Sequence, residues 1–157
     1  MTSIATKPAP TDDRLAVSAG VRSWTIAVGL TTMLQGVSAF LWPMRFYDDF
    51  PVPEAGWVST LGPFNEHLAR DFGSALAGLG AIAVLAGWSS SRTAVRGVMT
   101  GFVFFGVPHL LYHLATFDEF SVASALTQLA ALVLFVAVPA LLLAATRQSA
   151  TVKGATS

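Results

Sequence analysis

The sequence contains no cysteine. This absence excludes disulfide bonds, thiolate metal ligands, cysteine nucleophiles and iron–sulfur clusters. It also leaves the redox compartment undetermined, because that inference depends on how cysteines are used. Candidate chemistry therefore has to be sought among the other ionisable side chains.

Charged side chains are scarce as well. They make up 11% of the 157 residues, whereas an ordinary soluble domain carries about 25%. With 54% hydrophobic residues, the chain cannot cover a water-facing surface, so the composition predicts an integral membrane protein with one domain. The lipid bilayer is its expected surrounding. The formal net charge of zero gives no indication of a nucleic-acid partner, and none is expected.

Four segments are long and apolar enough to cross a hydrocarbon core, which takes about 20 helical residues. They are expected near Trp24–Trp42, His67–Trp88, Gly97–Phe117 and Val122–Ala145. Lipid cannot satisfy free backbone groups, so the spans should be helices. Short turns join the last three spans, and short connections make consecutive helices antiparallel neighbours. The sequence thus predicts an all-α fold, an antiparallel four-helix transmembrane bundle over residues 22–146.

The basic residues are distributed unevenly about these spans. Seven of the nine lysines and arginines fall on one side of the membrane, namely Lys7, Arg14, Arg22, Arg92, Arg96, Arg147 and Lys153. Because basic residues are enriched on the cytoplasmic side, both termini are expected there, in the inner (plasma) membrane. The flanking segments 1–21 and 147–157 are expected to be flexible.

The one long connection, residues 43–66, is then extracytoplasmic. It carries four prolines and five aromatic residues. Prolines stiffen a loop and aromatic rings favour the membrane interface. Two interpretations stay open: a packed cap over the end of the bundle, or an aromatic belt without that role.

Ionisable residues gather at the same end of the predicted bundle. His67 and Asp71 are spaced i, i+4 on the second span, and His109 and His113 have the same spacing on the third. Residues with this spacing share one helical face. With a rise of about 1.5 Å per residue, the two pairs overlap in depth. We therefore expect an outward-facing polar pocket between the second and third spans.

One interpretation of this pocket is a metal site. His67, Asp71, His109 and His113 would supply three imidazoles and one carboxylate, with Glu66 as an additional or outer ligand. This ligand set suits a transition metal, either zinc, iron, copper or manganese. A haem held by one histidine from each helix is the weaker alternative, because it leaves the second histidine of the third span without a role.

A second interpretation needs no metal. The same four side chains form an acid–base network, in which a histidine oriented by an aspartate acts as the general acid or base. Arg70 lies beside them on the second span, Tyr112 flanks the histidines on the third, and Gln128 belongs to a polar stripe on the fourth. The substrate would be an amphiphilic, lipid-like small molecule.

A third interpretation is structural. Glu66 and Arg70 have the spacing of an i, i+4 ion pair. Asp71 can neutralise Arg70 or His109 and so lock the second span to the third. The ionisable residues would then form a network between helices and take no part in chemistry.

Two motifs carry a resemblance to a known group. The stretches "NEHLARDFGSALAGLG" and "VPHLLYHL", together with the four spans, resemble the small four-helix membrane proteins of the DoxX-like group, over about Trp24 to Ala145. The matching part is Arg70 and Asp71 followed by the Gly/Ala-rich helix with Gly73 and Gly78. The resemblance implies a link with oxidoreductase systems and, through distant relatives, with membrane-embedded cyclases. It assigns no catalytic residue to this chain.

Two functions therefore remain open at the level of sequence. One is a metal-dependent or acid–base membrane enzyme that acts on a lipid-like molecule. The other is a non-enzymatic membrane accessory subunit, in which the His/Asp/Arg/Glu cluster connects helices. A homodimer or a complex with a membrane partner subunit is compatible with both.

Overall fold

The computed structural model describes the backbone of residues 16–154 and the side chains of residues 16–147. Four long helices dominate it: α1 (Ala19–Leu41), α3 (Glu66–Ser89), α4 (Arg92–Ala115) and α5 (Val122–Gly154). All four are long and apolar enough to cross a membrane. Three short elements complete the described part, namely α2 (Pro43–Asp49) and the 3-10 turns η2 (Ser59–Leu61) and η3 (Phe117–Glu119). The prediction of an all-α bundle with four spans is confirmed.

The helix ends differ from the predicted ones where a polar side chain caps the helix. The Ser91 hydroxyl accepts a hydrogen bond from the backbone N–H of Ala94, so α4 begins at Arg92 rather than near Gly97. Ser18 caps α1 in the same way. The backbone of α5 continues to Gly154, through most of the C-terminal segment that was expected to be flexible. Residues 1–15 and 155–157 of the two predicted flexible segments lie outside the described residues.

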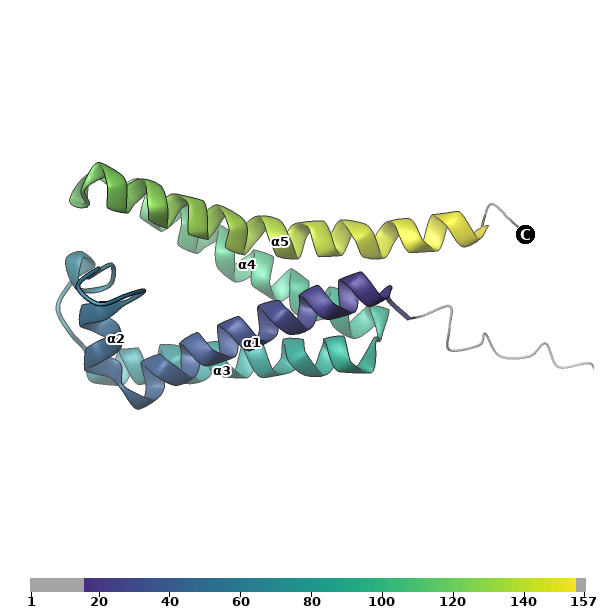
Figure 1. The fold of residues 1–157 in the computed structure, drawn as a ribbon, viewed down its shortest axis with the longest axis horizontal. Coiled ribbons are helices and arrows are strands. Elements are labelled where there is room, and N and C mark those ends of the chain that lie inside the picture. Colours follow the sequence, from purple (N-terminus) through teal and green to yellow (C-terminus); the bar gives the residue numbers. More distant parts are fainter. Residues whose placement is uncertain (1–15, 155–157) are drawn as a thin grey trace, which may run out of the picture.

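Figure 1 shows how the helices are arranged. The antiparallel helices α1 and α3 run side by side, and α4 and α5 form a second pair that covers them. We call the end of the bundle that carries α2 and residues 50–64 the cap end. The opposite end, where α1 begins and α5 ends, is the terminal end. Both ends of the described chain lie there (Figure 1), as an even number of spans requires.

The closest contact in the fold is between α1 and α3. Gly29 and Gly36 of α1 face Gly80 and Gly73 of α3, so each step of seven residues along one helix matches a step of seven along the other. A Cβ atom added at Gly29 would lie only 2.7 Å from the backbone nitrogen of Val84. Glycine is therefore required at these positions because the two backbones touch.

Small residues of α3 and α4 differ in whether they mark a helix contact. Gly73, Ala77 and Gly80 do face α1. The Gly97-x-x-x-Gly101 pattern of α4 marks no such contact: within the described residues, a Cβ at Gly97 would meet no atom within 4 Å, and one at Gly101 only the end of the Leu79 side chain. The pattern alone does not identify a packing face, since it occurs on exposed faces too.

The apolar core that joins the two helix pairs lies towards the terminal end. It consists of the buried residues Val21, Ala83, Ala86, Val95, Val98, Met99, Phe102 and Leu142. Small side chains from α3 face bulky ones from α4, which lets the pairs approach. Towards the cap end, aromatic rings take over this role.

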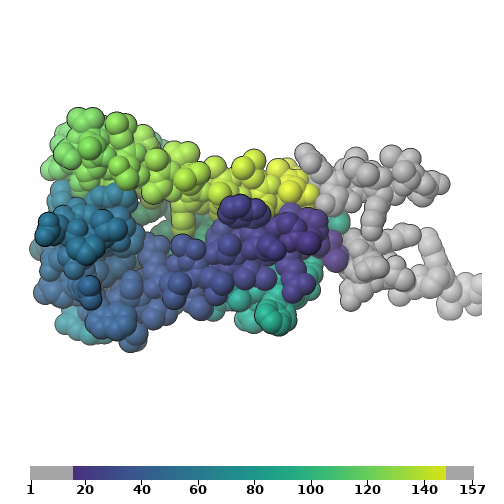
Figure 2. Space-filling model, in the orientation of Figure 1, coloured from purple at the N-terminus to yellow at the C-terminus, as the bar shows by residue number. Residues whose placement is uncertain are grey.

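The long connection at the cap end is folded. Pro43 occupies the first turn of α2, where its missing N–H costs nothing. The aromatic rings of the segment pack on one another and on α3, as Phe46–Phe50, Phe46–Phe72, Tyr47–Phe64 and Phe50–Trp57, with centroids 4.7 to 6.3 Å apart. The Tyr47 hydroxyl also donates a hydrogen bond to the carbonyl of Gly62. Figure 2 shows the segment of residues 43–64, in blue, gathered at one end of the molecule. The prolines and aromatic residues therefore form a packed cap.

Candidate functional site

His67 and Asp71 form a pair on the first turns of α3. The His67 Nε2 atom lies 3.3 Å from the Asp71 Oδ2 atom. The side chains are 87% and 64% exposed, respectively. The pair therefore lies on the outside of the bundle, and it contacts neither histidine of α4.

Glu66 and Arg70 connect α3 to α1 instead. The Arg70 Nε atom donates a hydrogen bond to the Glu66 carboxylate at 2.9 Å. Another nitrogen of the same guanidinium donates to the backbone carbonyl of Phe40, and the group lies over the Phe40 ring, 5.8 Å from its centroid. Phe40 is in the last turn of α1, where backbone carbonyls have no partner within the helix. Arg70 therefore donates a hydrogen bond to a carbonyl that has no partner within α1, and it links this end of α1 to α3.

His109 and His113 lie together on α4, half-buried among aromatic rings. Their ring centroids are 4.8 Å apart. His109 stacks on Phe105, and that ring in turn contacts Phe72 of α3 and Phe135 of α5. The two histidines are thus part of the aromatic packing that joins the helix pairs at the cap end.

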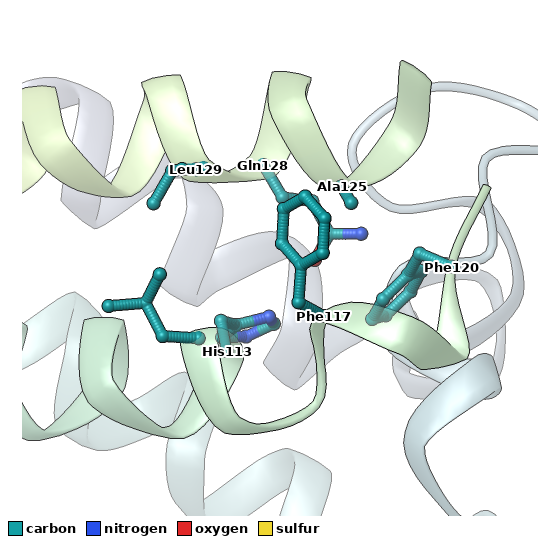
Figure 3. Close-up of a pocket in the computed structure, with 7 residues that line it drawn as sticks. His113, Phe117, Phe120, Ala125, Gln128 and Leu129 are labelled. Atoms are coloured by element: carbon teal, nitrogen blue, oxygen red, sulfur yellow. The ribbon is translucent and has the colours of Figure 1, made fainter. Parts of the chain in front are cut away.

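A small cavity lies beside His113, between the end of α4 and the start of α5. His113, Leu114, Phe117, Phe120, Ala125, Gln128 and Leu129 line it, and Figure 3 shows the α4 and α5 side chains facing each other across it. Its volume is about 10 Å³. That is room for about one water molecule. No lipid-like substrate fits there.

Two polar side chains, Gln128 and His113, lie at this cavity. Gln128 is 3% exposed, and its amide donates a hydrogen bond to the Ser124 hydroxyl at 3.4 Å. The Nδ1 atom of His113 is buried without a hydrogen-bond partner in the described part of the chain. Tyr112 lies beside the His113 ring, but its own side chain is largely exposed. Gln128 and His113 are therefore neighbours, as the polar stripe on the fourth span suggested.

The structure does not bring the four predicted site residues together. The residues that it describes contain no group of three or more His, Cys, Asp or Glu side chains placed to hold a metal ion. The physical reason is the rotation of α3. Its glycine face turns towards α1, so the face with His67 and Asp71 points outward while His109 and His113 pack among aromatic rings. The expected pocket between the second and third spans is thus replaced by two separate pairs. A bound transition metal stays a prediction.

A larger concavity lies on the cap and was not predicted. It has a volume of about 330 Å³, within the usual range for ligand sites. Ser38, Trp42, Arg45, Phe46, Asp49 and residues 50–53 line it. Arg45 and Asp49 face each other in it at 3.6 Å. Its walls come from one stretch of the chain, residues 38–53, and the proline and aromatic content of that stretch was the only signal for the groove in the sequence.

Comparisons of the chain with protein-family models, with curated proteins and with solved structures give no match.

Changing His113 to phenylalanine is expected to leave the free energy of unfolding unchanged or to raise it by up to about 1 kcal/mol. The ring keeps its packing against Phe120, while the unpartnered Nδ1 atom is removed. His113→Ala is the matched change, and it should lower the same free energy by about 2 kcal/mol because it empties the ring's place. Denaturant titration of the purified protein measures both. A loss of more than about 1 kcal/mol in His113→Phe would mean that Nδ1 has a partner.

Proposed function

We propose that the protein is a non-enzymatic membrane accessory subunit, in which the polar residues of the cap end hold helices in place. The observation that carries this proposal is the contact of Arg70 with both Glu66 and the Phe40 carbonyl. This contact of Arg70, the most extensive polar contact of the predicted cluster, joins α3 to α1.

The histidines support the same proposal. A cavity for about one water molecule beside His113 leaves no room for general acid–base chemistry on an amphiphile. The resemblance to the DoxX-like group also favours an accessory role, since members of that group are linked with oxidoreductase systems. Membership in this group is part of the proposal.

We place the protein in the inner membrane with its terminal end in the cytoplasm. The support is the position of the arginines among residues 16–147: Arg22, Arg92, Arg96 and Arg147 lie at the terminal end, whereas Arg45 and Arg70 lie at the cap end. A cytoplasmic excess of basic residues is the general rule for membrane proteins. The cap and its groove then face outward.

The test compares the wild-type gene, a deletion and a His109→Phe/His113→Phe double variant in the native host. An accessory subunit stabilises its partner, so the deletion should lower the abundance of at least one other membrane protein, as measured by quantitative proteomics. The double variant should restore that abundance, because it keeps the ring packing of α4. Failure of the double variant at a normal protein level would overturn the proposal. So would a stoichiometric transition metal that wild-type protein holds and the double variant loses.

The groove on the cap favours a second candidate function, which is binding of an amphiphile with a zwitterionic head. Arg45 and Asp49 offer one charge of each sign, and Trp42 and Val52 offer exposed apolar surface beside them. Titration of lysophosphatidylcholine into the purified protein, followed by tryptophan fluorescence, tests it.

Arg45→Gln and Asp49→Asn are expected to weaken this binding by about tenfold each, the effect of losing one charge-assisted contact. Arg147→Gln, at the other end of the molecule, is the control. Equal affinity in all three variants would contradict a site in the groove.

A further inference from the structure

We propose that a second copy of this chain docks on the outward face of α3, which is formed by His67, Asp71, Ser74 and Gly78. This inference goes beyond the proposed function, since it concerns the contact of the protein with itself. It is independent of which other membrane protein the chain supports.

The four residues share one side of α3. Their spacings of four, three and four residues place them on one helical face, and all four are exposed. Gly80, two residues beyond Gly78, touches α1. At 3.6 residues per turn, two residues are about 160° apart around the helix. The outward face is thus nearly opposite the face that α1 covers.

The depth of this face follows from the tryptophans. In the antiparallel register of α1 and α3, Trp42 lies about level with His67, and Trp24 lies near Trp88. All three tryptophans are exposed, as is typical of residues at the two membrane interfaces. From His67 to Trp88 the helix rises about 31 Å, which matches a hydrocarbon core of about 30 Å. Asp71 therefore lies about 6 Å inside the layer of outer interface residues.

An ionisable pair at this depth is expected to be shielded from lipid. Intramembrane carboxylates face the interior of a bundle or a partner in almost all membrane proteins, because lipid does not solvate them. Within residues 16–147, Asp71 faces neither the interior nor another helix: its side chain is 64% exposed, and His67, its neighbour on the same helix, is 87% exposed. The pair thus lies on a surface that a second protein helix has to cover.

The face is also shaped for close approach. Ser74 and Gly78 are spaced as a small-x-x-x-small pattern, which lets membrane helices come together. A Cβ added at Gly78 would meet nothing within 4 Å among residues 16–154. In contrast to Gly73 and Gly80, this glycine has no neighbour that explains it.

Charge complementarity identifies the partner as a second copy. A two-fold axis along the membrane normal would place two α3 helices parallel, with the same residues facing each other. His67 of each copy then reaches Asp71 of the other, so that two His67–Asp71 contacts form across the axis. A different protein would need a matching carboxylate and base at the same depth.

The chain offers a direct test, because it contains no cysteine. Ser74→Cys and Gly78→Cys are each made as single variants and oxidised with copper phenanthroline in native membranes. Non-reducing electrophoresis should show a disulfide-linked dimer for both. The control is Gly97→Cys on α4, an exposed glycine that likewise has no atom of residues 16–154 within 4 Å of its added Cβ. It should give several times less dimer.

A second measurement keeps the proposal testable where oxidation is inefficient. Gly78→Leu should raise the dimer dissociation constant in detergent by about tenfold, as measured by energy transfer between labelled copies. Its melting temperature at high dilution should be equal to or slightly above that of the wild type, because leucine favours the helix over glycine and a Cβ at Gly78 meets nothing within 4 Å among residues 16–154. The proposal is overturned if Ser74→Cys and Gly78→Cys give no more dimer than Gly97→Cys, or if they link only to a different protein. Neither outcome affects the test of the accessory function.

Discussion

Gly36→Leu is expected to separate α1 from α3 and to lower the free energy of unfolding by about 3 kcal/mol or more. At Gly36 an added Cβ would run into the backbone of Ala77 and Gly73. Backbone atoms cannot move aside as a flexible side chain can. The two helices therefore have to move apart along their length, and the neighbouring glycine contacts between them are lost as well.

For a chain of this size, about 1 kcal/mol corresponds to a shift of roughly 2–4 °C in melting temperature. Gly36→Leu should thus melt roughly 6–12 °C below the wild type, or fail to accumulate. Gly36→Ala is the milder change, and it should still destabilise the protein, although alanine favours helix over glycine by up to about 1 kcal/mol.

Gly97→Ala is the matched control, because it adds the same methyl group where the described residues leave open space. It should be neutral or slightly stabilising. Circular dichroism during heating in detergent measures all three variants. Equal melting of Gly36→Ala and Gly97→Ala would mean that α1 and α3 do not touch through their backbones.

Arg70→Gln is expected to lower the free energy of unfolding by about 1.5–3 kcal/mol, the usual effect of hydrogen bonds to charged groups. The change leaves the Phe40 carbonyl without its donor at the end of α1. It also removes the ion pair with Glu66. We expect the lower part of this range, because the Arg70 side chain is 39% exposed.

Arg45→Gln is the control for this prediction. Arg45 also forms an i, i+4 ion pair at the cap end, but its side chain is 76% exposed. Exposed pairs of this kind contribute about 0–1 kcal/mol. Arg70→Lys should fall between the two, because an ammonium group cannot contact the carbonyl and the carboxylate as a guanidinium does. Denaturant titration in mixed micelles measures each variant, and equal losses for Arg45→Gln and Arg70→Gln would contradict a role for the Phe40 contact.

These two predictions show what reasoning from sequence reached and what it missed. The i, i+4 pairs Glu66–Arg70 and His67–Asp71 were correctly recognised, because helical spacing alone places their members side by side. The contact of Arg70 with Phe40 was not. It joins residues thirty positions apart, and no local pattern marks a backbone carbonyl as the partner of an arginine.

The amino-acid sequence alone predicted a bundle of four membrane-spanning helices, and it left residues 43–66 open between a packed cap and an aromatic belt. The length, apolarity and low charge of a segment depend on that segment alone, so a membrane span can be predicted without knowing which helices pack against it. Only the tertiary structure decided how each helix is rotated and which helix it touches. Gly36 and Gly73 meet because small residues on two distant helices coincide in register. The glycine face and the ionisable face of α3 point in nearly opposite directions, because the helix is rigid. With the glycine face against α1, His67 and Asp71 point outward, away from His109 and His113.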